Sequence, residues 1–276
     1  MQQIGLMMTC DEEDCIEEVM NEHIKYFDKI LVLDGSSDRT EEIIRSYSQV
    51  KYFLKDKEII DKLPGHRVRD GARQFLLAKA QELYGYDGWF TLLHGDEIFY
   101  DNPVKIAEQA EKDRAEKINW YVMNFFLHTS DTDKNLEAIK SVQERVRWYC
   151  PGFLEIRQFK NKQGLHYELD RHAKVMPEGI GWKMYRHYPI YKHYPYRSVS
   201  QMLKKKQQHN KEAFSVSYLD VEDKKQCFRD VLPGFKQARE FDGSFHEFEI
   251  KNQGSIAWRW LRSYRYLPIQ IGNPFG

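Results

Sequence analysis

The sequence predicts an α/β protein built on a doubly wound, mostly parallel β-sheet with helices on both faces, followed by a C-terminal extension. Three observations predict this class. Short apolar runs alternate with segments of helical spacing over roughly the first 100 residues. Polar clusters follow several of these runs directly. Beyond residue 181 the composition shifts towards Tyr, His, Pro and basic residues. We therefore expect an α/β domain over residues 1–180 and an extension over 181–276 that packs on it.

The elements at the N-terminal end follow in a regular order. Residues 4–8 form an apolar strand, and residues 12–27 have the spacing of an amphipathic helix. Lys29–Asp34 is almost wholly apolar, which is typical of a strand buried on both faces of a parallel sheet. A helix should follow the turn at Gly35, with Asp38 as its cap and Glu41 completing a capping box. Residues 50–54 are the third strand.

The same alternation continues before it weakens. A long helix is expected over residues 66–85, and residues 89–99 read as a fourth strand that ends in a polar turn. A helix over 104–116 and a strand over 118–128 come next, and then shorter mixed strands over 144–160. Residues 199–214 are basic and have helical character.

Composition limits the function classes. The 276 residues carry 42 Lys and Arg against 42 Asp and Glu, and 14% are aromatic, so the chain should fold and should not be a general nucleic-acid binder. The charge is unevenly distributed, with a net −8 over residues 1–180 and +8 over 181–276. The four cysteines form no CxxC pair and predict reduced thiols in a cytoplasmic protein, and we expect neither a signal peptide nor a membrane span.

Three polar clusters lie where predicted strands end. They are Thr9 with Asp11 and Glu12, then Asp34, and then the turn from His94 to Glu97. Ligands of open α/β sheets bind at the carboxyl ends of strands. Acidic residues also cap helices and fill turns, and for Asp11 and Glu12 both interpretations stay open. Asp34 and Asp96 favour a ligand role, since adjacent carboxylates on a turn repel one another unless a cation binds them.

These residues carry a resemblance. The segment containing "DGSSDRT", followed by "WFTLLHGDEIF", resembles the nucleotide-sugar-binding half of family 2 glycosyltransferases with the GT-A fold over residues 3–130. In that family the second strand ends in Asp before such a turn, and the fourth ends in a D-x-D-type motif. A second stretch, residues 157–175, is similar to the "R-L-F-R-N-x-x-G-I-x-F-E-G-x-x-H-E" segment of some members.

The resemblance implies a donor site. Thr9, Asp11 and Glu12 would line the nucleoside pocket, and Asp34 would accept a hydrogen bond from the base or ribose. Arg73 or Arg67 would reach the diphosphate, although both could equally be solvent-facing helix charges.

The resemblance also implies a metal and a general base, with two departures from the family pattern. Asp96 would hold Mn²⁺ or Mg²⁺, and His172 and His193 would complete the metal or diphosphate shell, with a purely structural role left open for His172. His94 replaces the first acidic residue of the motif and could contact ribose or metal. Ala173 replaces the family Glu, so Asp170 becomes the nearest candidate base, with Glu168 and Glu97 behind it.

Two aromatic regions of the extension allow alternatives. The six Trp and Tyr residues between 182 and 196 could form a lid that stacks on sugar rings, or could close the core beneath the extension. The basic, Trp-rich residues 255–272 could lie in the interface of a membrane at its inner face, or dock on the domain.

The prediction is a metal-dependent glycosyltransferase that moves a sugar from a nucleotide-diphosphate donor, a UDP-sugar, to a hydroxyl of a glycan or lipid-linked glycan. His94 and Ala173 motivate an alternative, a catalytically degenerate domain that binds nucleotide sugar or glycan without turnover. A nucleotidyltransferase is a third hypothesis. The absence of a Gly-rich basic phosphate loop near the first strand counts against it.

Overall fold

The structure is a computed structural model that describes residues 1–55, 66–128, 135–167, 176–198, 200–201 and 239–245. The chain divides into two compact units, Met1–Phe241 and Asp242–Gly276. The fold below is that of the first unit. Of the basic helix expected over 199–214, the structure describes only residues 200–201, and the expected C-terminal helix lies outside the described residues.

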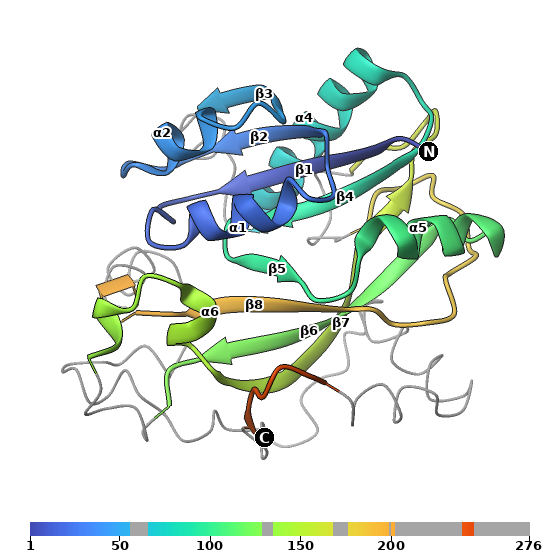
Figure 1. Cartoon of the computed structure of the whole chain (residues 1–276). Helices are drawn as coiled ribbons and strands as arrows, with labels where there is room; N and C mark the ends of the chain where they lie inside the picture. The colour runs from blue at the N-terminus through green and yellow to red at the C-terminus, as the bar shows by residue number, and fades with distance from the viewer. Residues whose placement is uncertain (56–65, 129–134, 168–175, 199, 202–238, 246–276) are drawn as a thin grey trace, which may run out of the picture. The chain divides into compact units, whose positions relative to one another are not determined.

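The described elements alternate through the first half of the chain (Figure 1). The strands are β1 Gln3–Thr9, β2 Lys29–Asp34, β3 Val50–Lys55, β4 Trp89–His94, β5 Glu97–Phe99, β6 Lys117–Phe126, β7 Trp148–Lys160, β8 Ile190–Tyr196 and β9 Arg239–Glu240. The helices are α1 Ile16–His23, α2 Thr40–Arg45, α4 His66–Tyr84, α5 Pro103–Lys112 and α6 Val142–Arg145, with a 3₁₀ turn at Leu136–Ala138.

All nine strands join one sheet in the order β3-β2-β1-β4-β7-β6-β8-β5, and β9 pairs with β7. The first four strands in this order are parallel, β7 is antiparallel to both neighbours, and β8 is parallel to β6. The register sets Thr9 beside Asp34 and Met8 beside His94. Parallel pairing therefore brings the carboxyl ends of β1, β2 and β4 to one edge, as the sequence predicts.

Helices cover both faces of the parallel half of the sheet. Alternate residues of β1 and β2 pack against the buried side of α4 in one cluster that includes Ile4, Leu6, Leu31, Leu76 and Leu77. Figure 1 shows α1 on the opposite face, where its buried residues are Ile16, Val19, Met20 and His23. Because side chains alternate across a strand, strands covered on both faces are apolar throughout, which explains the run "KILVLD".

Several expected elements differ from those observed. The segment 89–99 is not one strand: β4, which pairs with β1, ends at His94, and β5 pairs antiparallel with β8. The capping box at α2 is wrong, because the Glu41 carboxylate accepts from Arg45 and Lys55, while Asp38 accepts from the backbone N–H of Thr40. The mixed strands expected over 144–160 are a short helix, α6, and one 13-residue strand, β7.

The aromatic segment after residue 181 contributes to the core. Tyr185, Tyr191 and Tyr194 are buried, whereas the Trp182 side chain is 96% exposed. Strand β8 is hydrogen bonded within the same sheet as β6, so these residues belong to the first compact unit. The core-closing interpretation therefore holds for the three buried tyrosines.

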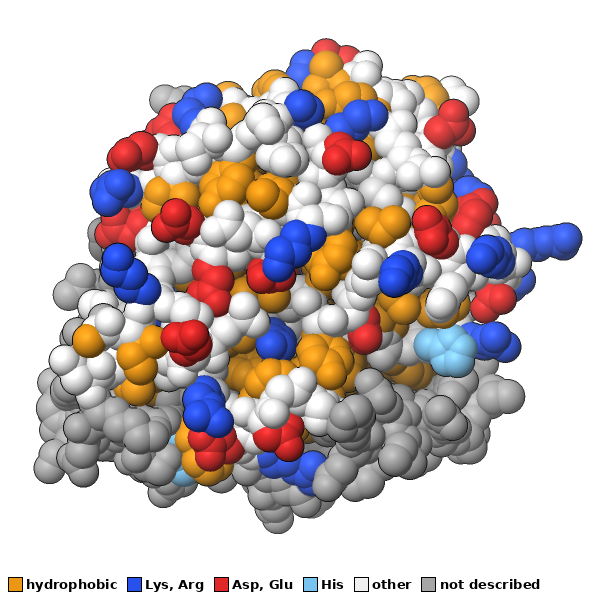
Figure 2. Space-filling model, in the orientation of Figure 1, with side chains coloured by type: hydrophobic (Ala, Val, Ile, Leu, Met, Phe, Trp, Pro, Cys, Tyr) orange, Lys and Arg blue, Asp and Glu red, His pale blue; other side chains and the backbone are white. Residues whose placement is uncertain are grey.

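The described residues also show the distribution of surface charge, the state of the thiols and the hydropathy of the helices. Figure 2 shows acidic and basic side chains interspersed over the visible face. Among the described residues, Cys10, Cys15 and Cys150 are free thiols. Across the described part of the chain, no helix is long and apolar enough to cross a membrane.

Candidate functional site

Asp34 ends β2 with a fully buried carboxylate. Its Oδ1 accepts hydrogen bonds from the Thr9 hydroxyl (2.8 Å), the Ser36 backbone N–H (3.2 Å) and the Ser36 hydroxyl (2.5 Å). Its Oδ2 is buried and accepts no hydrogen bond from any described residue. A desolvated carboxylate oxygen without a donor is costly, so Asp34 offers an acceptor to an N–H or O–H group of a ligand.

The loop after β1 is tied to the "DGSSDRT" loop after β2. Asp11 has a φ of 55°, in the left-handed region that residues other than glycine rarely adopt. Its backbone N–H donates to the Ser36 hydroxyl at 2.8 Å, and its carboxylate accepts from the Ser37 N–H at 2.7 Å. The next N–H, that of Glu12, donates to the Thr40 hydroxyl at 2.9 Å. Ser36, Ser37 and Thr40 of the motif therefore fix the backbone that carries Asp11 and Glu12.

The same loop lies against the turn after β4. A Cβ added to Gly95 would overlap the Glu12 carboxylate, so this turn must carry glycine for Glu12 to occupy its place. The Cys15 thiol donates to the Gly95 carbonyl at 3.3 Å. The predicted clusters after β1, β2 and β4 therefore form one site.

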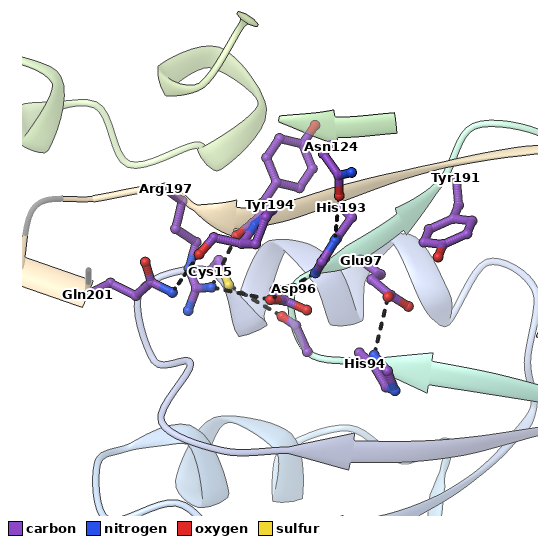
Figure 3. Close-up of polar contacts among 12 residues, drawn as sticks. Cys15, His94, Asp96, Glu97, Asn124, Tyr191, His193, Tyr194, Arg197 and Gln201 are labelled. Atoms are coloured by element: carbon purple, nitrogen blue, oxygen red, sulfur yellow. Dashed lines mark hydrogen bonds and ion pairs between the residues drawn. The ribbon is translucent and has the colours of Figure 1, made fainter. Parts of the chain in front are cut away.

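Asp96, in the turn between β4 and β5, lies beside His193 of β8 and Arg197 just after that strand (Figure 3). Its Oδ2 is 3.5 Å from His193 Nε2 and 3.8 Å from Arg197 Nη1. Its backbone carbonyl accepts from the Tyr194 N–H at 2.9 Å, which holds the turn to β8. Arg197 is fully buried, and its Nε and Nη2 donate hydrogen bonds to the Asp14 carboxylate at 2.8–3.0 Å.

Glu97 belongs to a separate ion-pair network. Its Oε1 lies 2.5 Å from Arg157 Nη2 and 3.2 Å from His94 Nδ1. Burial alone would raise the pKa of Glu97, but the charges of Arg157 and His94 lower it to about 2. Burial lowers the pKa of His94 from its ordinary value, against the opposing charge of Glu97.

Arg157 extends this network across the sheet. Its guanidinium also contacts Glu155 at 2.7 Å and the Tyr191 hydroxyl at 3.0 Å. Arg73 from α4 reaches the far oxygen of Glu155 at 3.9 Å and is itself buried, with an exposed fraction of 3%. Arg73 is therefore not the solvent-facing charge that the sequence left as an alternative.

The residues can be tested for their fit to a divalent cation. His94, Asp96 and Glu97 form a cluster that could bind a metal ion, with ligand atoms within 4.8 Å of one another. Arg157 already pairs with Glu97, so this carboxylate fits the role poorly. Asp96 and His193 fit better, because two ligand atoms at about 2.1 Å from one ion lie about 3.0–3.4 Å apart, close to the observed 3.5 Å.

The structure brings together most of the predicted site residues. Thr9, Asp11, Glu12, Asp34, His94, Asp96, Glu97 and His193 all lie around the carboxyl edge of the sheet. Asp170, His172, Glu168 and Ala173 lie outside the described residues, as does the side chain of Arg67. The assignments of Asp170 and His172 stay predictions.

Several residues of the site were missed by the sequence. The sequence predicted no role for Arg197, which lies beside Asp96, or for Asn124, whose side chain lies 2.9 Å from His193 Nδ1. Arg157 is the first residue of the second family-like stretch, but no role was predicted for it either. The run "HYPYRS" places Arg197 four residues after His193, which is the one available signal for it.

The sequence comparison agrees with this geometry. A family model described as "Glycosyl transferase family 2" matches residues 6–173. The chain belongs to glycosyltransferase family 2. The predicted GT-A-like α/β fold is confirmed, and membership in this family implies a nucleotide-sugar glycosyltransferase. The metal, the donor and the acceptor are not specified by it.

Two solved structures are similar over much of the chain. One is described as a glucose-1-phosphate thymidylyltransferase from Bacillus anthracis in complex with a sucrose, at 12% identity and a TM-score of 0.29, covering 80% of this chain and 79% of that one. The other is a mannose-1-phosphate geranyltransferase from Thermus thermophilus, at 11% identity and a TM-score of 0.32, covering 84% and 69%. No curated protein sequence matches the chain.

Proposed function

We propose that this family 2 glycosyltransferase transfers a sugar from a UDP-sugar to a hydroxyl of a glycan or lipid-linked glycan acceptor, with Mn²⁺ or Mg²⁺ bound by Asp96 and His193. The observation that carries the proposal is the position of Asp96. It faces His193 at 3.5 Å on the same sheet edge as Asp34 and Thr9. This edge is where the ligands of open α/β sheets bind.

The Asp34 carboxylate supports a uridine donor. Its free oxygen, Oδ2, can only accept a hydrogen bond. Uracil offers the N3–H of its ring to such an acceptor, as do thymine through N3–H and guanine through N1–H, whereas cytosine and adenine present unprotonated ring nitrogens at the equivalent edge. The Thr9 and Ser36 hydrogen bonds to Oδ1 hold the carboxylate in a fixed orientation.

The leaving group is the nucleoside diphosphate. A divalent cation at Asp96 and His193 would supply positive charge to that group as the bond to the anomeric carbon breaks. Arg197, 3.8 Å from Asp96, keeps the carboxylate beside β8. Arg73 supports the site through Glu155 rather than by reaching solvent.

The acceptor hydroxyl must lose a proton as it attacks the anomeric carbon. We propose Asp170 as the base that takes this proton. Glu97 suits the role less well, because it is paired with Arg157 and its pKa of about 2 makes it a weak base. We further propose that the segment after residue 181 forms the acceptor side, and that residues 255–272 supply any peripheral membrane contact.

A second candidate is nucleotide-sugar binding without turnover. The favouring observation is that both carboxylates of the turn already lie beside arginines, Glu97 beside Arg157 and Asp96 beside Arg197. The two guanidinium groups partly neutralise the negative charge of these carboxylates, which a bound metal ion would otherwise do.

A comparison of Asp96→Asn with the wild-type protein tests the proposal. We expect UDP-sugar hydrolysis and transfer by the wild-type protein with Mn²⁺, and at least a 100-fold loss in the variant, since about 2.7 kcal/mol of charge stabilisation corresponds to this factor. Asp113→Asn, which changes a half-buried carboxylate paired with Arg186, is the control and should keep full activity. Full activity of Asp96→Asn contradicts the proposal. Wild-type binding of UDP without hydrolysis or transfer favours the second candidate.

A further inference from the structure

The His193 imidazole is held at both ring nitrogens (Figure 3). Nδ1 lies 2.9 Å from Asn124 Oδ1, and Nε2 lies 3.5 Å from Asp96 Oδ2. The three residues come from β6, from β8 and from the turn between β4 and β5. Asn124 and His193 are direct neighbours in the parallel ladder between β6 and β8, so the sheet itself sets their separation.

The contact with Asn124 determines which nitrogen carries the proton. An amide oxygen only accepts hydrogen bonds, so Nδ1 must be the donor. Nε2 faces the Asp96 carboxylate, which also only accepts, so the two are joined either by a proton on Nε2 or by a cation between them. In the neutral Nδ1–H ring the Nε2 lone pair is free to bind that cation. A histidine that binds a metal through one nitrogen commonly donates the other N–H to such an acceptor, which fixes both the tautomer and the ring plane.

Space for the Asn124 amide comes from β7. A Cβ at Gly152 would lie 2.6 Å from Asn124 Nδ2 and would also overlap Val122. The amide NH₂ group thus faces the glycine, and the carbonyl faces the imidazole. Gly152 of β7, Asn124 of β6 and His193 of β8 therefore lie in a row across three neighbouring strands, and His193 in turn faces Asp96.

We propose that Asn124 is a positioning residue that holds His193 as the Nδ1–H tautomer, so that His193 Nε2 and Asp96 Oδ2 can share one divalent cation. Asn124 itself contacts neither the cation nor the donor. This inference rests on the proposed function for the identity of the ligand, but the tautomer is a property of the protein alone.

The tautomer is measured by long-range ¹H–¹⁵N NMR on protein labelled with [¹⁵N]histidine, with the His193 signals assigned by their loss in His193→Gln. Mn²⁺ affinity is measured by EPR titration in the presence of UDP. Asn124→Ala removes the acceptor, whereas Asn124→Asp keeps it. Asn21→Ala is the matched control, since this exposed asparagine also makes one side-chain hydrogen bond, to Tyr47, away from the site.

We expect wild-type His193 to carry a proton on Nδ1. Asn124→Ala should shift the ring towards the form that is protonated on Nε2 alone and weaken Mn²⁺ binding about 10–100-fold. Asn124→Asp and Asn21→Ala should retain both the tautomer and the affinity. The inference is overturned by an Nε2–H tautomer in the wild-type protein, by no change of tautomer or of affinity in Asn124→Ala, or by a wild-type protein that binds no Mn²⁺ with UDP. Absence of sugar transfer, with the expected results intact, counts against the proposed function alone.

Discussion

His23 is a titratable side chain in an otherwise apolar position of α1. Its ring is buried and packs near the rings of Phe27 and Phe99, with centroids 6.3 and 5.6 Å away. Burial lowers the pKa of His23 from 6.5 to about 4. Between these values the unfolded chain binds the proton more readily than the folded one, so stability falls as the pH drops below about 6.5. We expect this residue alone to remove about 1 kcal/mol between pH 8 and pH 5.5.

The comparison of His23→Leu with the wild-type protein isolates that effect. Urea unfolding at pH 8 and pH 5.5 should show a smaller loss of stability in the variant, by about 1 kcal/mol. His166→Leu, which replaces an exposed histidine, should retain the wild-type loss. An equal loss in His23→Leu and in the wild-type protein would contradict the buried, neutral state of His23.

Individual site residues differed in how far the sequence could reveal them. Asp34 and Asp96 were predicted because each follows an apolar run, and the end of a buried strand is visible in a single sequence. Arg157 and Arg197 were not assigned, because the site carboxylates that they pair with, Glu97 and Asp14, lie 60 and 183 residues away along the chain. An ion pair of that separation leaves no local pattern.

At the scale of elements, the turn between β4 and β5 is the junction that shapes the candidate site. Its glycine, Gly95, leaves room for the Glu12 carboxylate from the loop after β1. We expect Gly95→Ala to displace this carboxylate and to raise the Kd for UDP about tenfold or more, because small misplacements of binding groups cost that much. Isothermal titration with UDP measures the change.

A double-mutant cycle checks the cause. In the Glu12→Ala background the Glu12 carboxylate is gone, and the methyl group added by Gly95→Ala meets only the Thr9 methyl group, at 3.0 Å. The double variant should therefore bind UDP little more weakly than Glu12→Ala alone. Additive losses would mean that the added methyl group acts through some other contact, and would contradict the assigned role of the glycine.

The same turn shows why element boundaries escaped the sequence. "WFTLLHGDEIF" has the apolar character of one strand, and the parallel strands of the first half were recognised from such runs. The chain divides into β4 and β5 because β5 pairs antiparallel with β8, which is formed by residues 190–196. Pairing with a strand so distant in the sequence is decided by the tertiary fold rather than by local periodicity.

At the scale of the whole molecule, the acidic first part and the basic second part of the chain meet at Arg197. Residues 1–180 carry a net −8 and residues 181–276 a net +8, and Arg197 binds Asp14 and lies beside Asp96 in the acidic part. The sequence predicted two segments that pack together. It did not predict that β8 enters the same sheet, since the hydrogen-bonding partner of a strand is not encoded in its own residues.

Arg197 should therefore stabilise the first compact unit as a whole. Arg197→Gln leaves Asp14 without its bidentate partner and removes a fully buried cation, and we expect a loss of about 2–3 kcal/mol of unfolding free energy. The value lies below that of a completely buried pair because the Asp14 side chain is 30% exposed. Chemical denaturation measures it.

Arg186→Gln provides the matched control, since Arg186 pairs with Asp113 at 3.4 Å but its side chain is 71% exposed. We expect that variant to change stability by no more than about 0.5 kcal/mol. In Arg197→Gln the Asp14 carboxylate keeps only its 3.4 Å ion pair with Arg145, so adding Asp14→Asn should recover part of the loss by removing this poorly compensated charge. If the two arginine variants lose equal stability, or if Asp14→Asn deepens the loss additively, the connection between the two parts of the chain does not depend on this ion pair.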